Sequence, residues 1–413
     1  MTFTDLGLDA PLVARLADLG LTRPTPIQSK AIPHALAGRD VLGIAQTGTG
    51  KTAAFGLPLV AALSAEPVRP AAKGARGLVL APTRELAAQI VATLEGLTDG
   101  LRITLVVGGK SLNGQAQRLA RGTDILVATP GRLIDLMDRR AVDLGQTRFL
   151  VLDEADQMLD IGFIHALRRI APRLRAERQT MMFSATMPAQ MAELSGSYLA
   201  DPVRVEVSPP GRAADKVAQS VHFVARESKQ ALLVDLLDSH RAERALVFSR
   251  TKHGAERLMK QLERAGFAAA SIHGNKSQGQ RDRALEAFRA GTVRVLVATD
   301  VAARGIDIPE VAHVYNYDLP NVAENYVHRI GRTARAGRDG SAVAFCSAEE
   351  TAEFRAIEKM LGHRVRIAGG TPWPGAQPGT PPQGKRGEQG VAVLAAGEAD
   401  EPACALAHHA IGL

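Results

Sequence analysis

Residues 149–156 read FLVLDEAD, an apolar run that ends in three closely spaced acids. A continuous apolar run of this kind is typical of a strand buried on both faces, as in parallel sheets. Earlier in the chain, residues 45–52 read AQTGTGKT, a pattern whose backbone curls around phosphates. Ligands of parallel sheets bind at the carboxyl ends of the strands, so both segments are expected at one edge of a sheet. Together they predict hydrolysis of a nucleoside triphosphate.

Similar apolar runs alternate with helical patterns along most of the chain, which predicts α/β domains with mostly parallel sheets flanked by helices. A segment rich in proline, glycine and charge divides the series, so we predict a first domain at 1–205, a linker at 206–216 and a second domain at 217–368. Residues 369–413 have low complexity and are predicted to be a disordered tail. The strand-like runs are 40–44, 77–80, 103–107, 124–128, 149–152 and 180–183 in the first domain, and 245–248, 268–272, 293–298, 313–316 and 342–345 in the second.

The composition is that of a globular protein outside the membrane. The 413 residues are 46% hydrophobic, but no apolar run reaches the roughly 18 residues of a membrane span. Residues 1–20 lack the basic and apolar regions of a signal peptide. The two cysteines, Cys346 and Cys404, form no CxxC pattern, which fits a reducing compartment and indicates neither a disulfide framework nor a cysteine zinc site. We therefore expect a cytoplasmic protein with no membrane partner.

The formal net charge of +7 favours a polyanionic partner only weakly. Residues 369–413 carry −2, which leaves +9 for residues 1–368, so the basic charge belongs to the predicted domains. A basic protein without such a partner fits the charge equally well, so the sequence motifs have to distinguish between the two possibilities.

The phosphate loop is the first predicted site. Gly48 and Gly50 let successive backbone N–H groups point into one concavity, while Lys51 reaches the β- and γ-phosphates and the hydroxyl of Thr52 binds Mg²⁺. The pattern usually begins with glycine, where this chain has Ala45. The alternative is a turn rich in glycine and threonine that happens to carry a lysine. The predicted nucleotide contacts are Ala45, Gln46, Thr47, Gly48, Thr49, Gly50, Lys51 and Thr52.

The acids of residues 153–156 are the second predicted site. Asp153, at the end of a buried strand, is placed to hold Mg²⁺ through water, and Glu154 to orient and deprotonate the attacking water. The alternative is that one of these acids only caps the helix that follows. Pairing with the phosphate loop favours the catalytic interpretation.

These two motifs, in this order, resemble the DEAD-box ATP-dependent RNA helicases, and a dozen further motifs agree over roughly residues 1–366. Residues 272–308, IHGNKSQGQRDRALEAFRAGTVRVLVATDVAARGIDI, resemble the bacterial RhlE-type subgroup in particular. The resemblance implies two tandem RecA-like domains that use ATP and Mg²⁺ and bind RNA with little sequence specificity.

The resemblance also implies roles for residues beyond the two opening motifs. Residues 23–28 match an adenine-reading element, on which Phe3 is expected to stack. The further nucleotide contacts are Phe3, Arg23, Gln28, Gly305 and Asp307. Two arginines, Arg332 and Arg335, are expected to stabilise charge on the γ-phosphate once the domains close. The coupling residues are Asp156, Ser184, Thr186 and His328.

The RNA contacts that the resemblance implies lie in both domains. They are Pro82, Thr83, Arg84, Gly109, Thr129, Pro130 and Arg132 in the first domain, and Arg250, Gly274, Thr299 and Asp300 in the second. Hydroxyl, glycine and arginine groups suit phosphate and sugar contacts, which position a strand without reading its sequence. Each threonine is also a plausible helix cap, and residues 108–109 a plausible turn.

Three departures from the family pattern stand out. Ala334 replaces a usual glycine, Leu21 stands at a position that is often aromatic, and residues 369–413 lack the basic charge of many RhlE-type tails. RNA affinity is then expected to come mainly from the cleft between the domains.

The expected function is RNA-stimulated ATP hydrolysis, coupled to domain closure on single-stranded RNA and to separation of short duplexes. We expect a monomer that works on ribosome-related or RNA-decay ribonucleoproteins. Two alternatives remain: a DNA-directed translocase with the same domains, and an RNA clamp with little unwinding.

Overall fold

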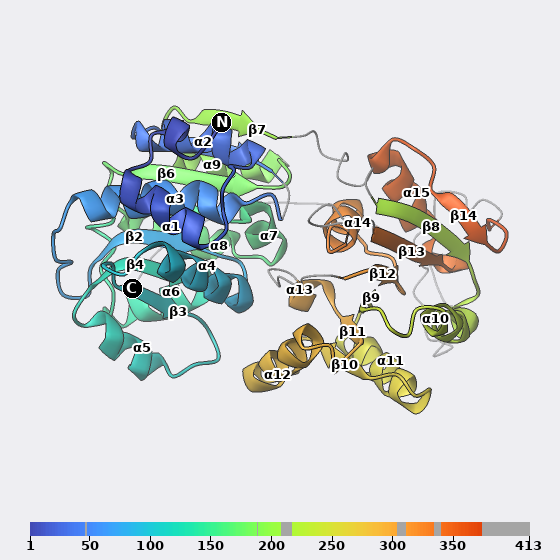
Figure 1. Cartoon of the computed structure of the whole chain (residues 1–413). Helices are drawn as coiled ribbons and strands as arrows, with labels where there is room; N and C mark the ends of the chain where they lie inside the picture. The colour runs from blue at the N-terminus through green and yellow to red at the C-terminus, as the bar shows by residue number, and fades with distance from the viewer. Residues whose placement is uncertain (46–47, 188, 208–216, 304–310, 334–339, 374–413) are drawn as a thin grey trace, which may run out of the picture. The chain divides into compact units, whose positions relative to one another are not determined.

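The computed structural model describes residues 1–45, 48–187, 189–207, 217–303, 311–333 and 340–373. Figure 1 shows the chain with its helices and strands labelled. Within these ranges, no helix combines the length and apolar character needed to cross a membrane.

The first half of the chain forms a seven-stranded sheet in which every pairing is parallel. The strand order is β3-β4-β2-β5-β6-β1-β7. The strands are β1 (Val41–Ile44), β2 (Ala75–Leu80), β3 (Ile103–Val106), β4 (Thr123–Ala128), β5 (Phe149–Leu152), β6 (Gln179–Ser184) and β7 (Val203–Glu206). The helices are α1 (Ala10–Asp18), α2 (Pro26–Leu36), α3 (Lys51–Ala65), α4 (Arg84–Leu97), α5 (Leu112–Leu119), α6 (Pro130–Asp138), α7 (Ala155–Asp160), α8 (Ile164–Ile170) and α9 (Ala189–Tyr198), with short 3₁₀ helices at Thr4–Leu6 and Ala171–Arg173.

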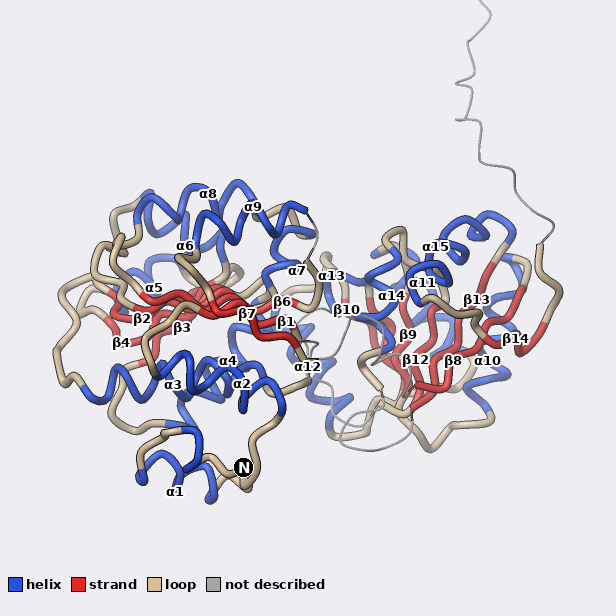
Figure 2. The backbone as a smooth tube through the Cα atoms, turned by 90° about the horizontal axis from the view of Figure 1, so that it is seen from above, coloured by secondary structure: helices blue, strands red, loops and turns tan. Residues whose placement is uncertain are grey.

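Helices cover both faces of this sheet, and alternate strand residues divide between the two resulting cores (Figure 2). In β5, Val151 belongs to the core that α1 to α4 complete, whereas Leu150 and Leu152 belong to the core on the face of α5 to α9. Successive side chains of a strand point to opposite faces, so a strand covered on both faces has to be apolar throughout. This is why the predicted runs are continuous rather than alternating.

The second half forms another seven-stranded parallel sheet with the order β10-β11-β9-β12-β13-β8-β14. Adding seven to each strand label of the first sheet reproduces this order, so the two halves share one topology. The strands are β8 (Val217–Phe223), β9 (Ala245–Phe248), β10 (Ala269–Ile272), β11 (Val295–Ala298), β12 (His313–Asn316), β13 (Gly340–Cys346) and β14 (Arg366–Gly369). The helices are α10 (Lys229–Asp238), α11 (Lys252–Arg264), α12 (Gln278–Arg289), α13 (Asp300–Ala303), α14 (Ala323–Ile330) and α15 (Thr351–Leu361), with 3₁₀ helices at Arg226–Ser228 and Ala348–Glu350.

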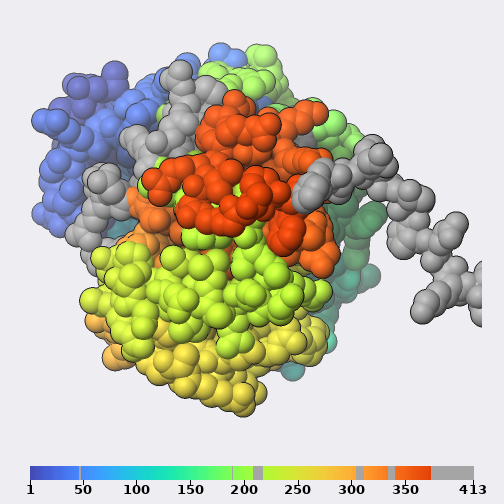
Figure 3. All heavy atoms as spheres, turned by 90° about the vertical axis from the view of Figure 1, so that its right-hand side faces the viewer, coloured from blue at the N-terminus to red at the C-terminus, as the bar shows by residue number. Residues whose placement is uncertain are grey.

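The second half also has a core on each face of its sheet. Residues of α10 and α11 pack with Val247, while residues of α12 to α15 pack with Leu246 and Phe248. Figure 3 shows a surface of this half on which residues around 230–270, in yellow-green and yellow, adjoin those near 350, in red-orange. The two sheets with their flanking helices confirm the predicted α/β fold class.

Three strands, β7, β8 and β14, were absent from the sequence prediction. In order along their sheets, β7 and β14 are edge strands and β8 is the neighbour of β14. Only Val205 of β7 is buried, and no residue of β14 is. Strands that are not covered on both faces have no need for a continuous apolar run, which was the signal used to find them.

The packed part of the chain extends past residue 368, where the tail was predicted to begin. Gly369 is the last residue of β14, and the indole N–H of Trp373 donates to the carbonyl of Cys346 over 3.0 Å. The rest of the predicted tail, from 374 on, lies outside the described residues, as do residues 208–216 of the predicted linker. The predicted domain boundaries stay a prediction.

Candidate active site

The predicted site residues of the first half follow the carboxyl ends of six strands. The phosphate loop follows β1, residues 153–156 follow β5, and residues 184–186 lie at the end of β6 and just after it. These three strands are adjacent in the sheet. The predicted RNA segments follow β2, β3 and β4, which are adjacent to one another on the far side of β5. The carboxyl edge of the sheet is therefore divided into two sides, one with the predicted nucleotide residues (the nucleotide side) and one with the predicted RNA residues (the RNA side).

Gly50 shapes the phosphate loop at the start of α3. Its backbone is left-handed, with φ of 90° and ψ of 24°, and its carbonyl accepts a hydrogen bond from Nε2 of Gln28 over 3.0 Å. A Cβ at this position would lie 2.5 Å from the same Nε2. Only glycine satisfies both the backbone and the contact. Gln46 and Thr47 lie outside the described residues.

Lys51 and Asp153 are buried near one another. Lys51 is 5% exposed, and its Nζ has no hydrogen-bond partner among the described residues. Asp153 is 2% exposed. Burial raises the pKa of Asp153 to about 7, against the opposing effect of Lys51 and with a smaller contribution from the like charge of Glu154. A buried ammonium without an acceptor fits a phosphate, and a buried carboxylate fits a cation.

These residues fit a bound Mg²⁺ as well as a nucleotide. Thr52 lies in the first turn of α3, half-buried, next to Lys51. A hydroxyl and a carboxylate are oxygen ligands of the kind that Mg²⁺ takes alongside water and phosphate. Asp153 and Thr52 are the residues that would hold the ion, which would neutralise charge on the phosphates.

Glu154 has a left-handed backbone, with φ of 52° and ψ of 50°. A non-glycine residue in this region is strained by about 1–2 kcal/mol. Glu154 begins α7, but its side chain makes no capping hydrogen bond. The interpretation of Glu154 as a simple acidic cap therefore fails, and the strain is consistent with a side chain aimed at a ligand.

Asp156 joins α7 to the segment that follows β6. Its Oδ2 accepts hydrogen bonds from the backbone N–H groups of Ala185 and Thr186, over 3.1 and 2.9 Å, and from Oγ1 of Thr186, over 3.0 Å. The hydroxyl of Ser184 in turn donates to the carbonyl of Thr186 over 2.7 Å. One carboxylate oxygen thus holds the predicted coupling segment in place.

The segment predicted to read adenine is held by hydrogen bonds of Gln28. Its Oε1 accepts from the backbone N–H of Thr25 over 2.9 Å, while its Nε2 binds the phosphate loop. Arg23 is exposed. Phe3 is 3% exposed and packs in the core with the α1–α4 helices. A stacked base needs an exposed ring face, so the structure favours a packing role for Phe3, and its stacking on adenine stays a prediction.

The RNA side of the first half brings Arg84, Gly109 and Arg132 together. A Cβ at Gly109, whose φ is 80°, would overlap Nη1 of Arg84. Arg132 donates to the carbonyl of Lys110 over 2.8 Å. Burial lowers the pKa of Arg84, and Arg132 adds to the effect as a like charge. Two neighbouring guanidinium groups at a glycine turn fit the phosphate backbone of a strand.

The threonines of these segments follow two patterns. The hydroxyl of Thr83 accepts from the backbone N–H of Leu86 over 3.2 Å and caps α4, so the capping alternative holds for this residue. Thr129 begins α6 without a side-chain capping bond, and Pro130 is the first residue of that helix. Pro82 is buried.

The predicted RNA residues of the second half occupy the equivalent strands. Arg250, Gly274 and Thr299 follow β9, β10 and β11, which have the places of β2, β3 and β4 in the shared strand order. Arg250 donates to Glu350 over 3.0 Å and to the carbonyl of Leu319 over 3.1 Å. Glu350 is also paired with the buried Lys229, a supporting pair that motif reasoning missed.

Sequence reasoning gave no role to Arg329, although it lies next to His328 in a segment that matches the family. It is 1% exposed, binds both carboxylate oxygens of Asp300, over 2.5 and 2.8 Å, and donates to Asn316 over 3.1 Å. Its guanidinium also lies 5.0 Å from the ring centroid of Phe248. The carboxylate of Asp300 therefore positions Arg329. The predicted contact of Asp300 with RNA stays a prediction.

The remaining predicted residues of the second half are placed only in part. Arg332 is 3% exposed, and His328 is half-buried in α14. Gly305, Asp307, Ala334 and Arg335 lie outside the described residues.

Comparison with known proteins agrees with this geometry. Two family descriptions match the chain: DEAD/DEAH box helicase over residues 25–194 and helicase conserved C-terminal domain over residues 228–337. The ATP-dependent rRNA helicase rrp3 of Aspergillus terreus is 45% identical over 367 residues, which are 88% of this chain and 81% of that protein. The DEAD-box ATP-dependent RNA helicase CshA of Bacillus subtilis is 42% identical over 367 residues, 88% of this chain and 73% of that protein.

A solved structure of S. cerevisiae Dbp5, bound to RNA and ADP BeF3, has a similar fold. The TM-score is 0.78 at 30% identity, covering 89% of this chain and 95% of that one. The two sheets are accordingly the predicted tandem RecA-like domains. The chain belongs to the DEAD-box family and is an ATP-dependent RNA helicase.

Proposed function

We propose that the chain separates short RNA duplexes locally, by closing its two domains on ATP and single-stranded RNA. The division of the first sheet's carboxyl edge into a nucleotide side and an RNA side carries this proposal. The second sheet has its predicted RNA residues after the three equivalent strands. A strand that contacts both sets, and a nucleotide that needs residues of both domains, each favour closure and so favour each other's binding.

In this proposal the nucleotide site uses residues of both domains. Lys51 and the phosphate-loop amides bind the phosphates, Asp153 and Thr52 hold Mg²⁺, and Glu154 accepts the proton of the attacking water. Arg332 and Arg335 stabilise the charge that develops on the γ-phosphate. When bound, Mg²⁺ would neutralise phosphate charge and orient the triphosphate.

Asp156 is the proposed link between hydrolysis and RNA. Its hydrogen bonds hold residues 185–186 beside the acids that bind the metal and the water. A change at the γ-phosphate that moves α7 would then move this segment too. RNA release after hydrolysis follows if the closed form loses these contacts.

Finer assignments rest on sequence and charge. We place the chain in the RhlE-type subgroup because of the resemblance of residues 272–308. We also propose that it is a cytoplasmic monomer that acts on ribosome-related or RNA-decay ribonucleoproteins. Contacts that are mainly to the RNA backbone predict weak sequence preference and strong salt dependence of binding.

ATPase stimulation by RNA and DNA of matched length and sequence tests the substrate. Stimulation at least tenfold greater with RNA is expected, and equal stimulation would favour the DNA-translocase alternative. Glu154→Gln tests the chemistry: we expect hydrolysis to fall about 100-fold or more, as for loss of a general base, with nucleotide affinity retained. Unchanged phosphate release would remove Glu154 from its role. If the unmodified chain hydrolyses ATP in the presence of RNA but separates no duplex, the clamp alternative would be favoured.

A further inference from the structure

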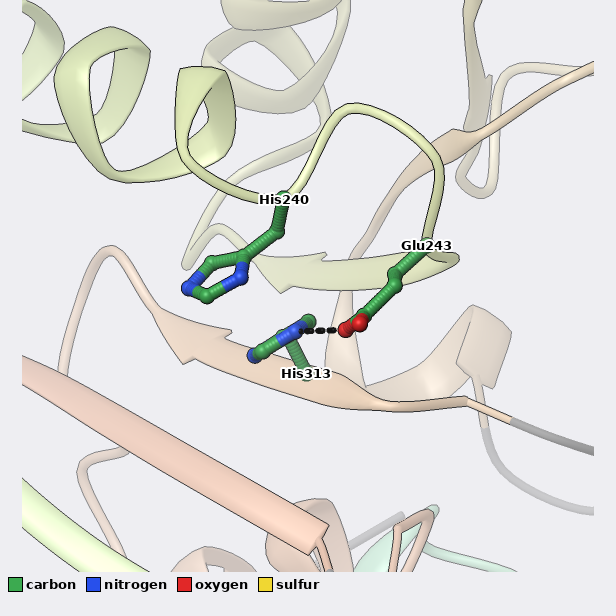
Figure 4. Close-up of side chains that lie close together, drawn as sticks. All are labelled: His240, Glu243 and His313. Carbon is green, nitrogen blue, oxygen red and sulfur yellow. Dashed lines mark hydrogen bonds and ion pairs between the residues drawn. The ribbon is translucent and has the colours of Figure 1, made fainter.

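A cluster of His240, Glu243 and His313 lies in the second half of the chain (Figure 4). His313 is the first residue of β12, and Glu243 comes two residues before β9 begins. The cluster is thus at the amino-terminal edge of the sheet. The RNA residues and Arg329's partners follow the carboxyl ends of the same strands, so the cluster has no part in the site described above.

The backbone fixes the positions of these three residues. The N–H of Glu243 donates to the carbonyl of His240 over 2.9 Å, which closes a turn just after α10. His313 pairs with Ala245 in the parallel register of β12 and β9. The N–H of Ala312 also donates to the carbonyl of Arg244 over 3.1 Å. A turn and a strand pairing therefore bring the side chains together without any contribution from the side chains themselves.

The side chains offer three metal-ligand atoms in a small volume. One ligand atom from each residue lies within 4.8 Å of the other two. Nε2 of His313 is hydrogen-bonded to the carboxylate of Glu243, and the rings of His240 and His313 are stacked, with centroids 4.0 Å apart and an interplanar angle of 25°. His313 is buried, His240 half-buried and Glu243 exposed.

The electrostatics of the cluster favour a cation. Burial lowers the pKa of His313, and the charge of His240 acts in the same direction, while Glu243 opposes both. A lowered pKa favours the neutral imidazole, which has a lone pair for a metal. Among the described residues, no lysine or arginine is ion-paired with Glu243, so its negative charge is available to an ion.

We propose that His240, Glu243 and His313 bind one divalent transition-metal ion, with Zn²⁺ as the expected occupant. Two imidazoles and a carboxylate are a zinc ligand set, and the exposed side of the cluster leaves a fourth position for water. Zn²⁺ with ligands at 2.0–2.1 Å holds them about 3.3 Å apart in a tetrahedral arrangement. The cluster thus has to contract, and the hydrogen bond between His313 and Glu243 gives way to two bonds to the ion. The proton on Nε2 of His313 moves to Nδ1 through solvent, which frees the lone pair of Nε2.

Binding also has to break the stacked pair of rings. A metal lies in the plane of each imidazole that binds it, and two nearly parallel rings cannot share an ion in that way. His240 therefore rotates toward the ion, which its half-buried position on a turn permits. The bound ion ties the end of α10 to the starts of β9 and β12 and stabilises this half of the chain.

The test uses the full chain, stripped with a chelator and titrated with Co²⁺ alone, whose visible spectrum reports coordination, and then with Zn²⁺ in competition. We expect one ion per chain with the absorption of a tetrahedral site. Zn²⁺ at about a hundredfold excess over its dissociation constant should raise the unfolding temperature of this half by about 5 °C or more. His240→Ala should weaken binding at least tenfold and remove that shift, and Glu243→Gln should weaken binding as well.

Two controls separate this site from other histidines. His253→Ala removes an exposed histidine of α11, and the double variant His408→Ala, His409→Ala removes adjacent histidines of the tail sequence. Both should bind the ion as the parent chain does, and His240→Ala should keep RNA-stimulated ATPase activity. The proposal is overturned if His240→Ala binds Zn²⁺ as tightly as the parent chain, or if the tail double variant abolishes binding.

Discussion

The substitution Asp153→Asn is expected to stabilise the nucleotide-free protein while it destroys ATP hydrolysis. Asp153 is 2% exposed, and burial raises its pKa from 3.8 to about 7. A folded-state pKa above the unfolded value means that the folded protein binds the proton more tightly. The resulting stability is present at low pH and is lost as pH rises from about 4 to 7. Above pH 7 the wild-type protein therefore holds a costly buried carboxylate.

The size of the effect follows from that shift. A rise of about three pKa units corresponds to roughly 4 kcal/mol at 1.36 kcal/mol per unit. Asparagine resembles the protonated acid but leaves Lys51 without a counter-charge, which offsets part of the gain. We expect Asp153→Asn to raise the free energy of unfolding by about 1–3 kcal/mol at pH 8. At pH 5 the wild-type side chain is mostly protonated, so the gain should shrink by roughly 2 kcal/mol or more.

Urea unfolding of wild type and Asp153→Asn at pH 5 and pH 8, without nucleotide or Mg²⁺, measures the gain in unfolding free energy at pH 8 and its decrease at pH 5. Asp18→Asn, at an exposed position of α1, is the matched control and should change stability little at either pH. RNA-stimulated ATPase activity of Asp153→Asn should be lost. A variant that is less stable than wild type at pH 8, or whose gain is the same at both pH values, would refute the buried-carboxylate reasoning.

Three further substitutions test other contacts. Asp156→Asn weakens an acceptor of three hydrogen bonds, and duplex separation should fall about tenfold or more while ATP affinity, measured with a fluorescent nucleotide, stays within twofold. Gly109→Ala places a side chain in a left-handed turn against Arg84, so RNA affinity should fall at least tenfold. Gly100→Ala, with open space around the added methyl group, is the control. Equal losses of RNA affinity in the two variants would argue against a role for the contact between Gly109 and Arg84. Arg329→Lys removes the two-point pairing with the half-buried carboxylate of Asp300 and should destabilise the second half by about 1–3 kcal/mol in urea unfolding. A change below about 0.5 kcal/mol would contradict a positioning role for this pair.

The nucleotide side of the site was predictable because each of its motifs is contiguous and follows a buried strand. Residues 45–52 and 153–156 each contain their whole chemistry within one short segment, and the apolar runs before them reveal the strands. The parallel sheet then brings the segments together. Prediction of β1 and β5 therefore also predicted that these two segments lie at one edge of the sheet.

The missed residues depend on contacts between distant segments. Arg329 binds Asp300 across 29 positions, and Lys229 binds Glu350 across 121. Nothing local in the sequence distinguishes such a residue from a surface arginine or lysine. The predicted stacking of Phe3 on adenine stays a prediction, but the structure shows its ring packed in the core, and a motif match does not reveal such burial.

Each sheet is made from one uninterrupted stretch of chain whose last strand lies beside its first: β7 pairs with β1, and β14 with β8. During synthesis on the ribosome, the first half therefore has all of its strands once residue 206 has emerged, before any strand of the second half has emerged. The second half cannot pair β8 on both sides until residues 366–369 are made, near the end of the packed chain. Premature termination within the last strand would leave a complete first half attached to a second half whose β8 has an unpaired edge, which we expect to be prone to proteolysis.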